Sequence, residues 1–130
     1  MAEHADYERA ERPSASPLTL QSAIFGKPPK LHVWVVVAND HVVGYCSGTC
    51  DFSTWRCEPF FHMDCLYLRE TFRGMGLGQR LIARLARFAR RNSIAELQWQ
   101  TPLWNDTAAS FYRHLGATEQ VKRRYSWRAG

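Results

Sequence analysis

The sequence has no apolar stretch close to the roughly 20 residues needed to cross a membrane. Its first residues are polar and acidic from Glu3 to Glu11, unlike the basic and apolar start of a signal peptide. With 130 residues, 45% hydrophobic and 22% charged, the composition is typical of one globular domain. We therefore expect a cytoplasmic protein that does not bind a membrane.

The sequence also has few cysteines, and none of them forms a C-x-x-C pair. The four are Cys46, Cys50, Cys57 and Cys65, of which the first two lie on the same face of an expected strand. A zinc site requires closer ligand pairs, and His62 does not complete one. We expect reduced, partly buried cysteines and no metal.

The formal charge of +5 raises the question of nucleic-acid binding. However, the basic residues are concentrated on one expected helix face and at the C-terminus. The helix positions are Arg80, Arg84, Arg87, Arg90 and Arg91. Such a stripe is typical of a solvated face, and it can also attract a polyanionic ligand. Nucleic acid is therefore not the expected partner.

The order of expected elements indicates a mixed α/β fold. A tail and a short helix over residues 18–25 precede the main domain, which begins with a hairpin of strands 31–38 and 42–50 turned at Asn39 and Asp40. A loop over residues 51–58 leads to a third strand over residues 60–68. Further elements are a helix ending near Arg91, a strand over 96–101, a helix over 107–115 stopped by Gly116, and a strand over 121–128. We divide the chain into residues 1–30 and a core of residues 31–130.

A glycine-rich turn, residues 73–78, joins the third strand to the long helix. Glycines there leave the N–H groups of a helix N-terminus accessible to an anion such as a phosphate. The turn lacks the Gly-Lys-Ser/Thr ending of a P-loop, and its glycines lack the dinucleotide spacing G-x-G-x-x-G. Its pattern is R-x-x-G-x-G, with Arg73, Gly76 and Gly78 in the three places. Taken alone, the turn could also simply begin a helix.

This pattern resembles the signature loop of the GNAT superfamily of N-acetyltransferases, which binds the pyrophosphate of acetyl-CoA. A second signature supports the resemblance: Trp104 and Asn105 precede a helix with Phe111 and Tyr112, and the match covers about residues 31–127. The resemblance implies the GNAT fold, a mixed and largely antiparallel central sheet flanked by helices.

Within the superfamily, the chain is most similar to the spermidine/spermine branch and its thialysine-acetylating relatives. The resemblance implies binding of acetyl-CoA by the strand before the turn, by the turn and by the second signature. The implied residues are Leu66, Tyr67, Leu68, Arg73, Gly74, Met75, Gly76, Leu77, Gly78, Gln79, Asn105 and Tyr112. We assign the pyrophosphate contacts to the backbone amides of residues 75–78 and a supporting role to Arg73.

Acetylation of an amine requires a base for the amine proton and an acid for the departing thiolate. The resemblance places the base at Asp64 and the acid at Tyr112. The family position of Asp64 is usually glutamate, so a water relay is more plausible than direct transfer. His62 is an alternative base because its unperturbed pKa is near 6.5. Asp64 could instead be a solvated edge residue, and Tyr112 a packed aromatic.

The beginning of the chain differs from the family, because the first strand is missing from the sequence as it stands. Residues 2–8 resemble the end of the first family helix. The strand over residues 31–38 would then have an unpaired edge, which a partner could cover, and we expect a homodimer. The expected activity is acetyl transfer from acetyl-CoA to a primary amine of a small molecule. Acetylation of protein lysines or N-terminal amines, and a degenerate acetyl-CoA-binding regulatory module, are the alternatives.

Overall fold

A computed structural model describes residues 17–130 of the chain, so nearly all of the expected tail lies outside the described residues, as do residues 2–8, which resemble the end of the first family helix. The chain divides into two compact units, the first ending at Gln100 and the second beginning at Thr101. Each unit is a continuous piece of the sequence.

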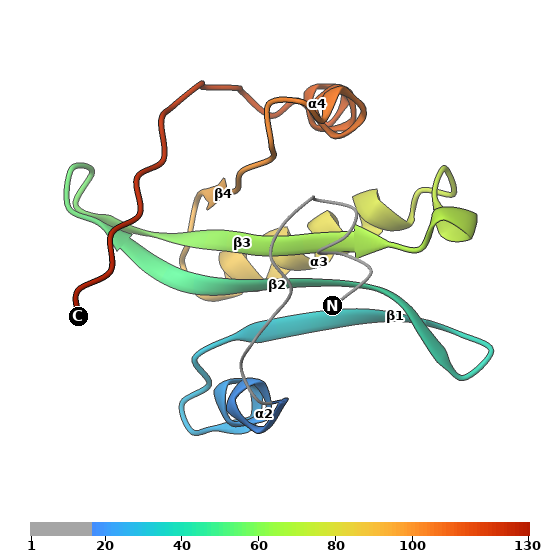
Figure 1. Ribbon diagram of the computed structural model, residues 1–130, viewed down its shortest axis with the longest axis horizontal. Helices are drawn as coiled ribbons and strands as arrows, with labels where there is room; N and C mark the ends of the chain where they lie inside the picture. Colours follow the sequence, from blue (N-terminus) through green and yellow to red (C-terminus); the bar gives the residue numbers. More distant parts are fainter. Residues whose placement is uncertain (1–16) are drawn as a thin grey trace. The chain divides into compact units, whose positions relative to one another are not determined.

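The first unit contains a four-stranded sheet in the order β1-β2-β3-β4 (Figure 1). The strands are β1 (His32–Ala38), β2 (His41–Ser53), β3 (Glu58–Leu68) and β4 (Leu97–Gln98). The pairs β1–β2 and β2–β3 are antiparallel, whereas β3 and β4 are parallel. This mixed, mostly antiparallel sheet confirms the expected fold class.

Tight turns connect the antiparallel strands. Asn39 and Asp40 adopt φ angles of 50° and 64°, which these two residue types tolerate better than most, and they join β1 to β2 as expected. The expected loop over residues 51–58 is shorter than predicted, because β2 and β3 continue to Ser53 and from Glu58 as a hairpin.

Three helical segments accompany this sheet. The helix α2 (Pro17–Phe25) confirms the expected short helix and is followed by Gly26, whose N–H donates to Ser22 O. A single 3-10 turn, η1 (Glu70–Phe72), follows β3, and α3 (Leu77–Arg91) begins after the glycine-rich turn. These bounds agree with the expected helix ending near Arg91.

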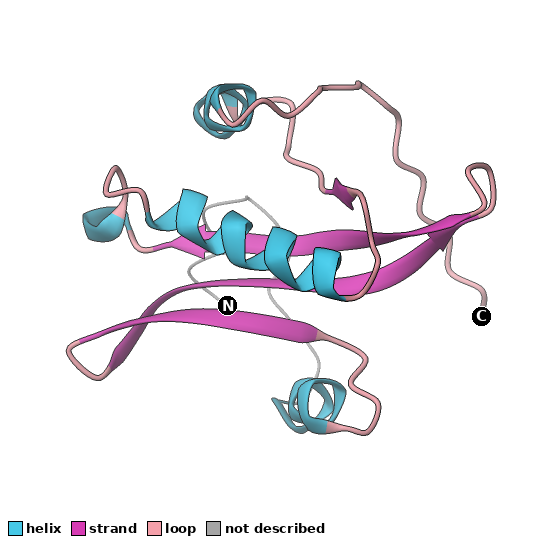
Figure 2. Ribbon diagram, turned by 180° about the vertical axis from the view of Figure 1, so that it is seen from behind, coloured by secondary structure: helices cyan, strands magenta, loops and turns pink. Residues whose placement is uncertain are grey.

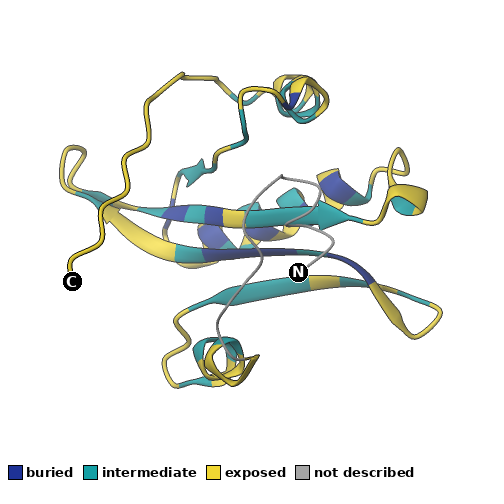
Figure 3. Cartoon of the chain, in the orientation of Figure 1, coloured by how far each residue is buried: buried dark blue, intermediate teal, exposed yellow. Residues whose placement is uncertain are grey.

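The core lies between α3 and one face of the sheet, which α3 crosses in Figure 2. The helix buries Leu81, Leu85 and Ala89, and its arginines are exposed, so the arginine stripe expected from the sequence is the solvated face. The buried residues gather on β2, β3 and α3 (Figure 3). Around them pack partly buried side chains: Trp34, Val36, Leu66, Leu68, Ile82, Phe88, Leu97 and Trp99.

A bulge interrupts the ladder between β2 and β3. Ser47 pairs with Cys65, but the next residue, Gly48, pairs with Met63, so Asp64 is an extra residue on β3. Before the bulge, Phe61 and Met63 are buried in the core beneath α3. After it, Leu66 packs against that core instead. The alternation of β3 therefore shifts by one residue at Asp64.

The strand β4 is much shorter than the expected strand over residues 96–101. Only Leu97 and Gln98 pair with β3, opposite Phe61 and His62. In the part of the chain that the structure describes, no strand pairs with the outer edge of β3 beyond His62. The parallel pairing of β3 with β4 is thus limited to these two positions.

The second unit contains the helix α4 (Asp106–His114). Asn105 caps it, with Oδ1 accepting from Ala108 N at 3.1 Å, and Gly116 follows its end with φ 87°. The prediction of a strand over residues 121–128 is wrong: the described residues 117–130 form no strand, and residues 118–130 are exposed. A strand requires a neighbour for its backbone hydrogen bonds, and alternation in the sequence does not supply one.

Candidate functional site

The glycine-rich turn leads directly into the N-terminus of α3. Gly74 and Gly76 adopt φ angles of 76° and 78°, a region that costs a side-chain-bearing residue about 1–2 kcal/mol. Around both positions there is open space, since no atom lies within 4 Å of an added Cβ. The requirement for glycine here is therefore conformational, and it leaves the backbone open to a ligand.

The beginning of α3 is arranged to receive an anion. Gly76 occupies the N-cap position without a side-chain cap, and the first turn contains no acidic residue. The first N–H groups of an α-helix have no partner within the helix, and the helix dipole adds partial positive charge there. Gly78 is buried, so a larger residue would meet the packed interior. A phosphate group has the charge and the acceptor oxygens that this turn can bind.

Arg73 secures the other end of the turn. Its Nε donates to Leu68 O at 2.8 Å, and its guanidinium lies 5.5 Å from the centre of the Tyr67 ring. The last residue of β3 is thereby tied to the first residue of the glycine-rich turn. The supporting role of Arg73 in binding acetyl-CoA stays a prediction.

The outer edge of β3 lies just before this turn. Because β4 pairs only with Phe61 and His62, the edge over residues 63–68 faces no strand of the described chain. An extended ligand with amide groups can hydrogen-bond to such an edge as an added strand would. The expected binding residues Leu66, Tyr67 and Leu68 all lie in this segment.

Asp64 and His62 lie on the face of β3 that points away from the core. Asp64 is the exposed bulge residue, and His62 is half-buried opposite Thr49. The core residues Phe61 and Met63 alternate with them on the other face. The structure thus places both candidate bases on one side of the strand, and their roles in the reaction stay predictions.

The two-residue alternation of side chains along β3 does not predict which groups contact Asp64. Cys65 should point into the core by the strand period, yet its sulfur lies 3.7 Å from Asp64 Oδ2, on the same side. Tyr45 and Ser47, at alternate positions of β2, hydrogen-bond with that sulfur. In the sequence, the one indication of these contacts is that Tyr45 and Ser47 are two residues apart and so lie on the same face of a strand.

The second signature lies in the second unit. Asn105 is buried and its side chain caps α4, which is a structural role beside the contact with acetyl-CoA that is expected of it. Tyr112 is half-buried on α4, with its ring centre 5.4 Å from that of Phe111. Its roles in binding and catalysis stay predictions.

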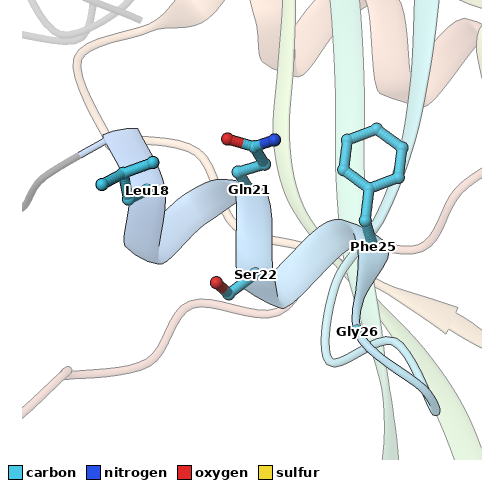
Figure 4. Close-up of a pocket in the computed structure, with 5 residues that line it drawn as sticks. All are labelled: Leu18, Gln21, Ser22, Phe25 and Gly26. Carbon is cyan, nitrogen blue, oxygen red and sulfur yellow. The ribbon is translucent and has the colours of Figure 1, made fainter.

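A separate hollow of about 470 Å³ lies beside α2 (Figure 4). It is lined by Leu18, Gln21, Ser22, Phe25 and Gly26. None of these side chains is ionisable, so the hollow offers neither a base nor an acid for a reaction. We assign no chemistry to it.

Residues 17–130 contain no group of three or more His, Cys, Asp or Glu side chains able to hold a metal ion. None of their helices has both the length and the apolar character of a membrane span.

Comparison with known proteins identifies relatives. A thialysine N-epsilon-acetyltransferase of Bos taurus is 28% identical over 126 residues, covering 90% of this chain and 74% of that protein. One of Caenorhabditis elegans is 41% identical over 61 residues, and the match spans 47% of this chain but only 38% of the relative. An L-ornithine N5-acetyltransferase of Arabidopsis thaliana is 28% identical over 80 residues, which are 61% of this chain and 35% of that one.

The fold also matches solved structures. An aminoglycoside acetyltransferase from an uncultured soil metagenomic sample superposes with a TM-score of 0.80 at 21% identity, over 95% of this chain and 82% of the other. Because the identity is low, this match shows the fold alone. The model of the acetyltransferase (GNAT) family matches residues 2–117. The chain, with its R-x-x-G-x-G turn at the start of α3, therefore belongs to the GNAT family of acetyltransferases.

Proposed function

We propose that this protein transfers the acetyl group of acetyl-CoA to a primary amine of a small molecule. The observation that carries the proposal is the continuous path from the open edge of β3 through the glycine-rich turn to the N-terminus of α3. Acetyl-CoA combines the two features that this path fits, an extended amide-containing arm and a pyrophosphate.

The reaction forms one bond and breaks another. The amine nitrogen attacks the carbonyl carbon of the acetyl thioester, the C–N bond forms, the C–S bond breaks, and coenzyme A leaves as a thiolate. The amine gives up a proton, and the thiolate takes one. We assign the first transfer to Asp64, directly or through a water molecule, with His62 as the alternative, and the second to Tyr112.

The choice of a small amine is supported by the relatives. Their names specify thialysine and L-ornithine, both small molecules that carry amino groups. Because the match spans only 38% of the Caenorhabditis elegans relative and 35% of the Arabidopsis thaliana one, the acceptor is proposed for this chain and not transferred as known.

A direct assay tests this proposal. The protein is incubated with acetyl-CoA and a panel of small amines, and both thiol release and the mass gain of one acetyl group are measured. Peptides with a free lysine or a free N-terminus form a second panel. Transfer confined to peptides would contradict the small-molecule assignment. Binding of acetyl-CoA without any transfer would indicate a regulatory module instead.

We further propose a homodimer that covers the outer edge of β1. This strand has a sheet neighbour on only one side among the described residues, and Val35 and Val37 are exposed along it. Exposed strand edges readily pair with another chain. A sedimentation experiment that finds only monomer at high concentration would contradict the dimer. The cytoplasmic location also stays a prediction, for cell fractionation to test.

A further inference from the structure

A polar cluster lies on the face of the sheet opposite α3. We define it by five residues: Tyr45, Ser47, Asp64, Cys65 and Tyr67. The pairs Tyr45–Tyr67 and Ser47–Cys65 are direct neighbours across β2 and β3, and the two tyrosine ring centres are 6.4 Å apart. The cluster therefore combines two aromatic rings, a hydroxyl, a thiol and a carboxylate on adjacent strands.

The bulge on β3 creates this grouping. In a regular strand, consecutive residues such as Asp64 and Cys65 point to opposite faces. Here the extra residue turns Cys65 to the same side, and its thiol donates to Asp64 Oδ2 at 3.7 Å. Ser47 and Tyr45 hydrogen-bond with the same sulfur. The thiol thus links the exposed carboxylate to two hydroxyl groups of β2.

The thiol of the cluster and one of its phenols are uncharged at neutral pH. Burial raises the pKa of the Cys65 thiol, and the neighbouring Asp64 carboxylate raises it further, so the thiol is neutral. Burial of the Tyr45 phenol, and next its neighbour Cys65, likewise raise the pKa of Tyr45. Asp64 is the one carboxylate side chain among the five residues.

A positive charge bounds the cluster at its Tyr67 end. The Arg73 guanidinium lies 5.5 Å from the centre of the Tyr67 ring. An acceptor that places one ammonium at Asp64 and its body over the tyrosines is compatible with this arrangement, because aromatic rings pack well against apolar and planar groups. A second ammonium near Tyr67 would be repelled by Arg73, and no second carboxylate of the cluster would offset that repulsion.

We propose that this cluster receives the acceptor of the reaction, that it selects amines with one ammonium group and an uncharged or aromatic body, and that Cys65 sets this selectivity. The inference rests on the proposed acetyl transfer and adds the class of acceptor. Acceptors with two or more ammonium groups are disfavoured, including the two named for the relatives, because the position next to Asp64 holds a neutral thiol where a second carboxylate would stabilise a second ammonium. We therefore infer that this chain differs from those relatives in its acceptor.

The test compares phenethylamine, which has one ammonium and an aromatic ring, with the diamine putrescine. The ratio of their kcat/KM values is measured at saturating acetyl-CoA for the wild type and for Cys65→Asp. We expect the wild type to favour phenethylamine and Cys65→Asp to shift the ratio toward putrescine by about fivefold or more, the worth of one new ion pair. Cys65→Asn is the uncharged control of similar size, and Cys50→Asp adds an acid at an exposed position of β2 outside the cluster.

A wild type that prefers putrescine would overturn the proposal, as would equal shifts in Cys65→Asp and Cys65→Asn. If Cys65→Asp does not fold, as judged by circular dichroism, Arg73→Gln provides the second test. It removes the positive charge at an exposed position and should shift the ratio in the same direction. Because acetyl-CoA is saturating, a lower affinity of this variant for acetyl-CoA does not change the measured ratio of kcat/KM values.

Binding of the two amines separates the failure of this inference from the failure of acetyl transfer. Calorimetric titration of each amine into the protein saturated with coenzyme A measures the same selectivity without turnover. Selective binding without transfer would support the cluster and contradict the proposed function. Transfer with no selectivity between the two amines would contradict the inference about the cluster and support the proposed acetyl transfer.

Discussion

Arg73 Nε donates to Leu68 O at 2.8 Å and so joins the end of β3 to the beginning of the glycine-rich turn. The bond fixes the turn relative to the strand whose open edge precedes it. Both parts of the proposed acetyl-CoA site therefore depend on this one side chain.

Replacing Arg73 should weaken donor binding. We expect Arg73→Ala to raise the Kd for acetyl-CoA by about tenfold, the usual effect of losing a hydrogen bond from a charged group. Calorimetric titration with acetyl-CoA measures the change. The control is Arg87→Ala, which removes an exposed arginine from the middle of α3. Equal losses in the two variants would show that general charge attraction, and not this contact, is responsible.

Gly76 should resist substitution for a conformational reason. Its φ of 78° is unfavourable for alanine, so Gly76→Ala should lower the free energy of unfolding by about 1–2 kcal/mol. Asparagine tolerates this region better, and Gly76→Asn should lose less. Urea unfolding of both variants measures the difference. Since no atom lies within 4 Å of the added Cβ, a steric clash would not explain the loss. An alanine variant as stable as the asparagine variant would contradict this explanation.

Asp64→Asn tests the proposed base. The amide cannot accept the amine proton, and we expect kcat to fall by about a hundredfold, within the range for general base catalysis. The matched variant is His62→Gln, which removes the alternative base on the same face of β3. A large loss in His62→Gln together with a normal rate in Asp64→Asn would move the assignment to the histidine.

Tyr112→Phe tests the proposed acid. Removing the hydroxyl should lower kcat by about tenfold or more, while the affinity for acetyl-CoA changes little. Single-turnover rates and a separate titration distinguish the two quantities. Tyr125→Phe is the control, because Tyr125 is an exposed tyrosine of the same unit. Turnover as fast as that of the wild type would leave Tyr112 as a packing residue beside Phe111.

Glu96 should make the stability of the first unit depend on acidic pH. Gln98 Nε2 donates to its carboxylate at 2.7 Å, and together with Arg56 this lowers the pKa of Glu96 below its ordinary value of 4.5, against the opposing effect of burial. A lowered pKa stabilises the folded state above pH 4.5, and this stabilisation is lost as pH falls through the folded value.

Urea unfolding between neutral pH and pH 3 should therefore show a shallower pH dependence in Glu96→Gln than in the wild type. Glu58→Gln is the control, because Glu58 is a second carboxylate that contacts Arg56. If the wild type and Glu96→Gln lose stability in parallel over this range, the carboxylate contacts of Glu96 contribute nothing.

Local patterns were sufficient for most of the elements. The exposed arginine stripe of α3, the Asn39–Asp40 turn and the end of α4 before Gly116 depend on a few neighbouring residues, and the structure confirms each of them. The strand expected over residues 121–128 failed for the opposite reason. Its alternation was present, but a strand forms only where another strand accepts its backbone hydrogen bonds.

The sequence by itself determined the glycine-rich turn and the helix that follows it, because positive φ angles and an apolar helix face depend on residues close together in the chain. Only the tertiary structure decided which side chains accompany Asp64. The register between β2 and β3 makes Asp64 an extra residue and turns Cys65 toward Tyr45 and Ser47. That register depends on pairing between strands, and alternation along β3 alone would have placed Cys65 in the core.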